Sequence, residues 1–70
     1  MSVSYELWCI ATSNALALSE DPDDIRRIVR YESAKFGDDH ELFVGVTDEN
    51  DNVIDRYSGA RLTEWARAGA

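Results

Sequence analysis

Hydrophobic and polar residues alternate near the start of the chain, over residues 4–12. Alternation with a period of two is typical of a β-strand that buries one face. Two large apolar residues, Trp8 and Ile10, fall on the opposite face, so we expect this strand to be central, or its second face to be covered. Turn-forming residues 12–14 then predict a hairpin with a short strand over residues 15–19. The first apolar face comprises Val3, Tyr5, Leu7, Cys9 and Ala11.

The clearest boundary in the chain is the run Asp21-Pro22-Asp23-Asp24. An Asp can cap a helix, a Pro suits the first helical position, and two acids complement the positive end of the helix dipole. Gly37 can adopt the left-handed conformation that ends a helix. We therefore predict a helix over residues 22–36, with an apolar face of Ile25, Ile28, Val29 and Phe36.

A second hairpin and a second helix follow. Residues 41–48 alternate with Leu42, Val44 and Val46 on one face, a turn occupies residues 49–52, and a strand returns over residues 53–58. Gly45 within the first of these strands indicates a bulge or the close approach of another backbone. Helical spacing over residues 59–68 predicts a short helix. The sequence thus predicts one α+β domain over residues 1–70, of order ββαββα, with a four-stranded antiparallel sheet and its helices packed on one face.

The chain is too short for more than one small core, because a domain of 70 residues has a large surface for its volume. Cys9 is the only cysteine and His40 the only histidine, so neither an intramolecular disulfide nor a structural zinc site can supplement that core. We therefore expect additional burial from self-association or from a protein partner.

The acidic balance changes the range of partners that we expect. Lys and Arg total 7 against 14 Asp and Glu, which gives a net charge of −7 and a pI near 4.4. Such a surface repels phosphate backbones and disfavours direct binding of nucleic acid. The sequence shows neither a signal-peptide pattern nor a run of about 20 apolar residues, so we expect a cytoplasmic protein without membrane contact. No cofactor or small-molecule ligand is indicated.

The candidate sites for metal or acid–base chemistry are weak. Residues 48–52 match the opening of a calcium loop, but Val53 and Gly59 stand where the loop requires Gly and a bidentate Glu. Residues 38–41 gather three carboxylates and His40, which fits a weak metal patch less well than a polar connector. Cys9 is expected to be an inert core thiol, because it shares a strand face with Leu7. We expect no catalytic, cofactor or metal residue.

Large aromatic and arginine side chains are the candidate interface residues. Trp8 and Trp65 would be anchors if they are exposed, because aromatic side chains carry large contact areas. Arginine forks can bind carboxylate or phosphate groups, although pairing with Asp23 and Asp24 is an alternative. The basic cluster on the first helix comprises Arg26, Arg27 and Arg30.

Several short motifs resemble a group of short, uncharacterised bacterial proteins that open with a YELWD-like strand. They are Tyr5 to Trp8 (YELW), Asn14, the Val29-Arg30 pair, Gly37, the strand over residues 42–46, the acidic-Asn turn, Gly59, Leu62 and Ala66. The chain departs from this pattern at Cys9, where an acid is usual. The resemblance implies a compact cytoplasmic bacterial domain and transfers no site residue, because the group has no established activity.

These features favour a non-enzymatic protein-interaction or regulatory module. One alternative is an acidic inhibitor that mimics nucleic acid toward a basic protein, as in phage or defence systems. It requires the acids of residues 20–24, 38–41 and 48–51 to share one face. Another is a small enzyme whose site forms across a dimer interface, lined by His40 and Glu41 or by Tyr5, Tyr31 and Tyr57.

Overall fold

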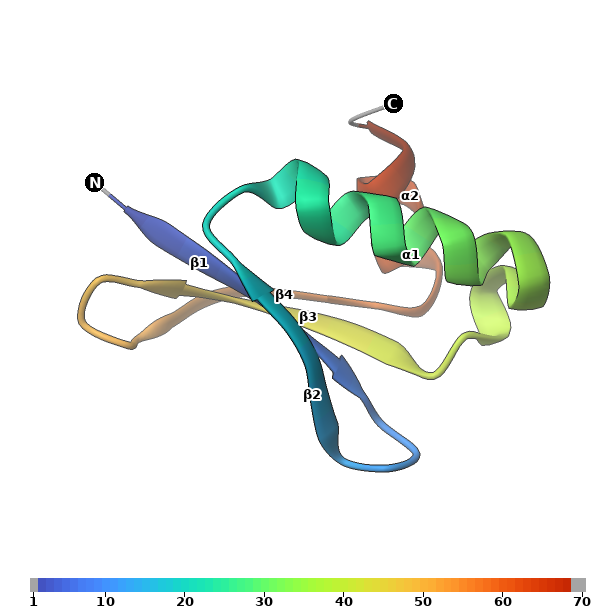
Figure 1. Cartoon of the computed structure of the whole chain (residues 1–70), viewed down its shortest axis with the longest axis horizontal. Helices are drawn as coiled ribbons and strands as arrows, with labels where there is room; N and C mark the ends of the chain where they lie inside the picture. Colours follow the sequence, from blue (N-terminus) through green and yellow to red (C-terminus); the bar gives the residue numbers. More distant parts are fainter. Residues whose placement is uncertain (1, 69–70) are drawn as a thin grey trace.

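A computed structural model describes residues 2–68 of the chain (Figure 1). The element order is ββαββα, as the sequence predicts, and one short 3₁₀ turn follows the first helix. The elements are β1 (Val3–Cys9), β2 (Asn14–Ser19), α1 (Pro22–Phe36), η1 (Gly37–Asp39), β3 (Leu42–Asp48), β4 (Val53–Ser58) and α2 (Gly59–Ala68).

The four strands form one antiparallel sheet in the order β2-β1-β3-β4. The two hairpins therefore meet through β1 and β3, and the predicted central position of the first strand is confirmed. Both helices lie on the same side of the sheet, with α1 over β1 and β2 and α2 over β3 and β4 (Figure 1). The predicted α+β fold with helices on one face is confirmed.

The core lies between the sheet and the helices, and it is built from the apolar stripes of both layers. Burial of this apolar surface is the main force that holds the two layers together. One polar pair is buried with it, His40 and Thr63. The core side chains are Leu7, Ile25, Val29, Leu42, Val44, Val46, Leu62 and Ala66.

The local signals at the ends of α1 act as predicted. The Asp21 carboxylate accepts a hydrogen bond from the N–H of Asp23 at 3.0 Å, and Pro22 occupies the first turn. Gly37 follows the last helical residue with φ 61° and ψ −136°, a conformation that favours glycine. The observed helix has the bounds that the sequence predicts.

Two details of the sequence prediction are wrong. The first strand ends at Cys9, because residues 10–13 form a turn in which Ser13 takes a φ of 56°. On α1 only Ile25 and Val29 of the predicted apolar face are buried, whereas Ile28 and Phe36 are exposed. Among residues 2–68, no helix is long and apolar enough to cross a membrane.

Candidate functional site

The face of the sheet opposite the helices carries no other element among the described residues (Figure 1). Because successive residues of a strand point to opposite faces, the residues between the core positions form this open face. The register arranges them in rows that run across the strands. One row comprises Leu18, Glu6, Gly45 and Arg56, and the next comprises Ala15, Trp8, Phe43 and Ser58.

The open face is rich in large apolar side chains. Trp8 and Phe43 stack with ring centroids 6.2 Å apart and planes within 9°, and both are half-buried. Leu18 is 68% exposed and Ile10 57% exposed. A shallow hollow of about 260 Å³ lies beside this pair, lined by Ile10, Phe43, Arg56 and Ser58. Trp8, one of the predicted interface anchors, therefore lies on the open face, near the end of β1.

Gly45 lies in the middle of the open face, in regular strand pairing with Glu6 and Arg56. The nearest irregularity of the β3–β4 ladder comes between Val46 and Thr47, so the predicted bulge at Gly45 is wrong. A Cβ atom built at Gly45 would have no neighbour within 4 Å, and the φ of this residue is not positive. Within the described chain, neither crowding nor backbone conformation calls for glycine here.

Trp65 lies on α2, on the helix side of the sheet. The rings of Tyr5 and Tyr57 stack on it at centroid distances of 5.8 and 5.2 Å, and the Arg26 guanidinium lies 4.6 Å from the ring centroid. These contacts anchor α2 to β1, β4 and α1. Trp65 is half-buried among them, and it therefore lies on a different surface from Trp8.

The structure divides the predicted arginine cluster. Arg26 donates from Nε to the carbonyl oxygen of Trp65 at 3.1 Å, and Arg30 donates from Nη1 to that of Ala66 at 2.9 Å. These carbonyls lie in the last turn of α2, where a helix has no internal donors left. Arg27 points to solvent and lies 3.8 Å from Asp24. Two of the three arginines thus join the helices, and the third pairs with Asp24 at the surface.

The sole cysteine and the sole histidine line one cavity at the edge of the sheet, of about 500 Å³. Cys9 is half-buried and not fully buried as expected, because β1 ends there. Hydrogen bonding to Thr12 lowers the pKa of the Cys9 thiol. Its partner in a catalytic pair would be His40, but Nε2 of His40 is 2.9 Å from Thr63 Oγ1, and no hydrogen bond joins His40 to Cys9 in residues 2–68.

The acidic clusters do not share one stripe. Residues 20–24 precede α1 and residues 38–41 follow it, so the 15-residue helix separates them by about 22 Å. Residues 48–51 form the β3–β4 turn. Arg26 and Arg27 also lie within 4 Å of Asp23 and Asp24. This arrangement does not favour the acidic-mimic hypothesis, which stays a prediction.

In the turn after β3, the Asp48 carboxylate binds backbone N–H groups of the turn itself. Asp48 Oδ1 accepts from the N–H groups of Asn50 and Asn52 at 2.9 and 3.0 Å. The hydrogen bond from Asn52 is the main cause that lowers the pKa of Asp48. No group of three or more His, Cys, Asp or Glu side chains in residues 2–68 is placed to hold a metal ion.

Sequence reasoning missed Phe43, Gly45 and Arg56 as members of a surface. The signal was present, because the alternation that buries Leu42, Val44 and Val46 sends the intervening residues to the opposite face.

Comparison of the chain with protein-family models, with curated proteins and with solved structures finds no match in any of the three. The resemblance to proteins with a YELWD-like strand therefore stays a prediction.

Proposed function

We propose that this chain is a non-enzymatic protein-interaction module that pairs with a second copy of itself through the open face of its sheet. The observation that carries the proposal is the Trp8–Phe43 pair, stacked on a sheet face that no other described element covers. In a two-layer α+β fold, the second face of a sheet is normally polar. Here it presents aromatic and aliphatic side chains whose burial would stabilise an assembly.

The absence of a side chain at Gly45 supports a partner that packs flat against the sheet. Glycine weakens the interior of a strand. Where it occurs there, it often marks a site at which another backbone approaches closely. Apart from its two chain neighbours, no described residue lies within 4 Å of a Cβ atom built at Gly45. A second sheet laid on this face would supply the missing neighbour.

The charges beside Gly45 favour a second copy over an unrelated partner. Glu6 and Arg56 flank Gly45 in one row, on strands roughly 10 Å apart, and they form no ion pair with each other. A two-fold axis along β3 would set Glu6 of each copy over Arg56 of the other. It would also set the two Gly45 residues against each other. A self-complementary patch of this kind is what a symmetric dimer requires.

The size of the face predicts a weak dimer. Four strands of six or seven residues present a flat area of about 400 Å² per copy, at strand spacings of about 4.8 Å. Two such faces would bury at most about 800 Å² in total, which is below the roughly 1,200 Å² at which stable specific interfaces begin. We therefore expect a reversible dimer with a dissociation constant in the micromolar range or weaker.

Sedimentation velocity over about 5 to 500 µM protein tests the proposal. The wild-type chain should shift from monomer to dimer across this range. Gly45→Val should remain monomeric while its melting temperature stays equal or rises, because valine fits the strand and has free space in the monomer. Tyr31→Ser, a change at a 61% exposed site on α1, is the matched control and should dimerise as the wild type does. A monomeric wild type at 500 µM would overturn the proposal.

Charge reversal tests the two-fold arrangement itself. Glu6→Arg and Arg56→Glu should each weaken the dimer about tenfold, because each places like charges opposite one another. The double variant restores opposite charges and should recover most of the affinity. If the double variant is as weak as the two single changes combined, Glu6 and Arg56 do not meet across the interface.

A further inference from the structure

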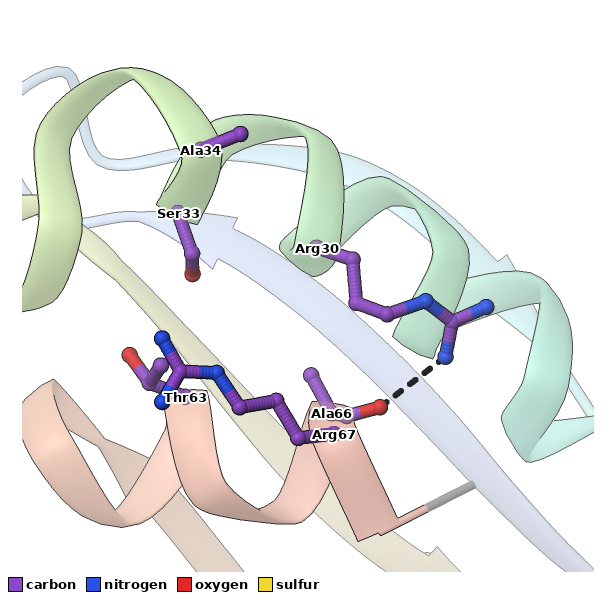
Figure 2. Close-up of a pocket in the computed structure, with 6 residues that line it drawn as sticks. All are labelled: Arg30, Ser33, Ala34, Thr63, Ala66 and Arg67. Atoms are coloured by element: carbon purple, nitrogen blue, oxygen red, sulfur yellow. Dashed lines mark hydrogen bonds between the residues drawn. The ribbon is translucent and has the colours of Figure 1, made fainter. Parts of the chain in front are cut away.

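A small cavity lies between α1 and α2, on the helix side of the sheet and away from the open face (Figure 2). Its volume of about 260 Å³ is below the roughly 300 to 1,000 Å³ of ordinary small-molecule pockets, so only a small ligand fits. Among residues 2–68 the lining contains no acidic side chain. It comprises Arg30, Ser33, Ala34, Thr63, Ala66 and Arg67.

The two arginines of this cavity have no carboxylate partner among the described residues. Acids outnumber bases two to one in the chain, and the ion pairs of the described residues use Arg26, Arg27 and Arg61. Arg30 uses Nη1 to bind the Ala66 carbonyl and keeps its other N–H donors. The Arg67 side chain makes no hydrogen bond within residues 2–68. In so acidic a chain, two such arginines at one cavity indicate a place for an anion from outside.

A buried hydroxyl in the same cavity also lacks a partner. Ser33 Oγ is shielded from solvent and makes no hydrogen bond in the described part of the chain. A buried hydroxyl without a partner costs about 1–3 kcal/mol, so such groups are rare in stable folds. Figure 2 shows this hydroxyl pointing from α1 toward α2. The Arg67 side chain runs back along α2 toward the Thr63 end of the cavity.

We propose that this cavity binds a small oxyanion, either a phosphate or a carboxylate. Arg67 would supply a two-pronged guanidinium contact, Ser33 Oγ–H a neutral hydrogen bond, and Arg30 the second positive charge. The C-terminal end of α2 carries a partial negative charge that would repel an anion. Arg30 reduces this repulsion, because its guanidinium binds the Ala66 carbonyl oxygen. Because donors come from both helices, the bound anion would bridge α1 and α2. This site is independent of the proposed dimer face.

Thermal unfolding at constant ionic strength tests the site, with chloride replaced stepwise by inorganic phosphate or, in a second series, by acetate. A ligand that binds only the folded state raises the melting temperature in a saturable way. A rise with phosphate or with acetate supports the proposal, and the series with the larger rise identifies the preferred oxyanion. Equal melting temperatures in chloride, phosphate and acetate would overturn it.

Two variants locate the effect, and a third is the control. Arg67→Gln should abolish the saturable rise, and Ser33→Ala should weaken the apparent affinity about tenfold while removing the buried unpaired hydroxyl. Arg27→Gln removes an equal charge from a solvent-exposed position outside the cavity and should keep the rise. Should Arg67→Gln respond to phosphate as the wild type does, the anion binds elsewhere. Phosphate-induced ¹⁵N shifts should centre on residues 30–34 and 63–67 in the wild type, and their absence from both segments would exclude the cavity.

Discussion

The half-buried carboxylate of Asp55 accepts hydrogen bonds from several donors. The Tyr57 hydroxyl donates to Asp55 Oδ2 at 2.8 Å, while the Arg56 N–H and Arg61 Nη2 donate to Oδ1 at 2.8 and 3.2 Å. The Tyr57 hydrogen bond is the main cause that lowers the pKa of Asp55, and the same bond raises the pKa of Tyr57. These contacts join the end of β4 to the start of α2.

The shifted pKa values of Asp55 and Tyr57 make their contribution to the free energy of unfolding depend on pH. A lowered carboxyl pKa stabilises the fold above the unfolded value of about 3.9, and this contribution is lost as pH falls through the folded pKa. A raised tyrosine pKa acts in the opposite sense, with its contribution lost as pH rises above about 10. Asp55→Asn should therefore be less stable than the wild type near pH 7, and the difference should shrink at both extremes. Urea unfolding from pH 3 to pH 11 measures it.

Glu64→Gln on the exposed side of α2 is the control for Asp55→Asn, because it removes the same charge without these contacts. A constant difference between Asp55→Asn and the wild type across the whole pH range would contradict the assignment.

The second helix depends on the first. A ten-residue helix is marginal in isolation, because few of its backbone groups are paired internally. Arg26 and Arg30 reach across from α1 and satisfy carbonyls of the last turn of α2. Positive charge at this end also complements the helix dipole. The two helices therefore act as one layer.

Arg26→Met should loosen the last turn of α2 and cost about 1 kcal/mol of unfolding free energy, because it removes a charged donor and keeps the apolar stem. Arg27→Met, at a position 72% exposed, should change stability by less than about 0.5 kcal/mol. Chemical denaturation gives the unfolding free energy of each variant. Faster amide hydrogen exchange over residues 65–68 would report that the last turn of α2 is loosened. Equal losses in the two variants would show that the carbonyl contact is not what stabilises α2.

Most of the helices and strands can be predicted from local sequence signals. The Asp21-Pro22 signal and the helical period define α1 without tertiary information, and the bounds of β4 and α2 were also predicted from pattern alone. The role of Arg26 was beyond such reasoning, because its acceptor lies 39 residues away on a helix whose position depends on the whole sheet. The end of β1 was missed because Ile10 and Ala11 continue the alternation of residue types, although the structure places them in the turn over residues 10–13.

The candidate sites, like the elements, were predictable from sequence only where the signal is local. Trp8 was named from its size and lies on the open face, whereas the row that joins Glu6, Gly45 and Arg56 needs the register of three strands. The cavity between the helices needs the placement of α1 against α2, which no local pattern contains. Residue types can therefore suggest a surface, but neighbours across strands define it.

At the scale of the whole molecule, the sheet separates two surfaces of different chemistry. The open face is apolar with one charge of each sign, and the helix layer holds Arg30 and Arg67, which have no carboxylate partner among the described residues. A change on one surface leaves the contacts of the other in place, so the dimer and the oxyanion site can be tested in the same preparation.

The pairing of β1 with β3 has a consequence for the speed of folding. Each hairpin closes a short loop, whereas Cys9 and Leu42, the nearest β1–β3 pair in sequence, lie 33 residues apart. Closing the longer loop costs more entropy, so this step should limit the rate. In stopped-flow measurements, Val44→Ala in the centre of β3 should mainly slow folding, whereas Ala17→Gly on the edge strand β2 should mainly speed unfolding. The reverse order would mean that the first hairpin forms the nucleus.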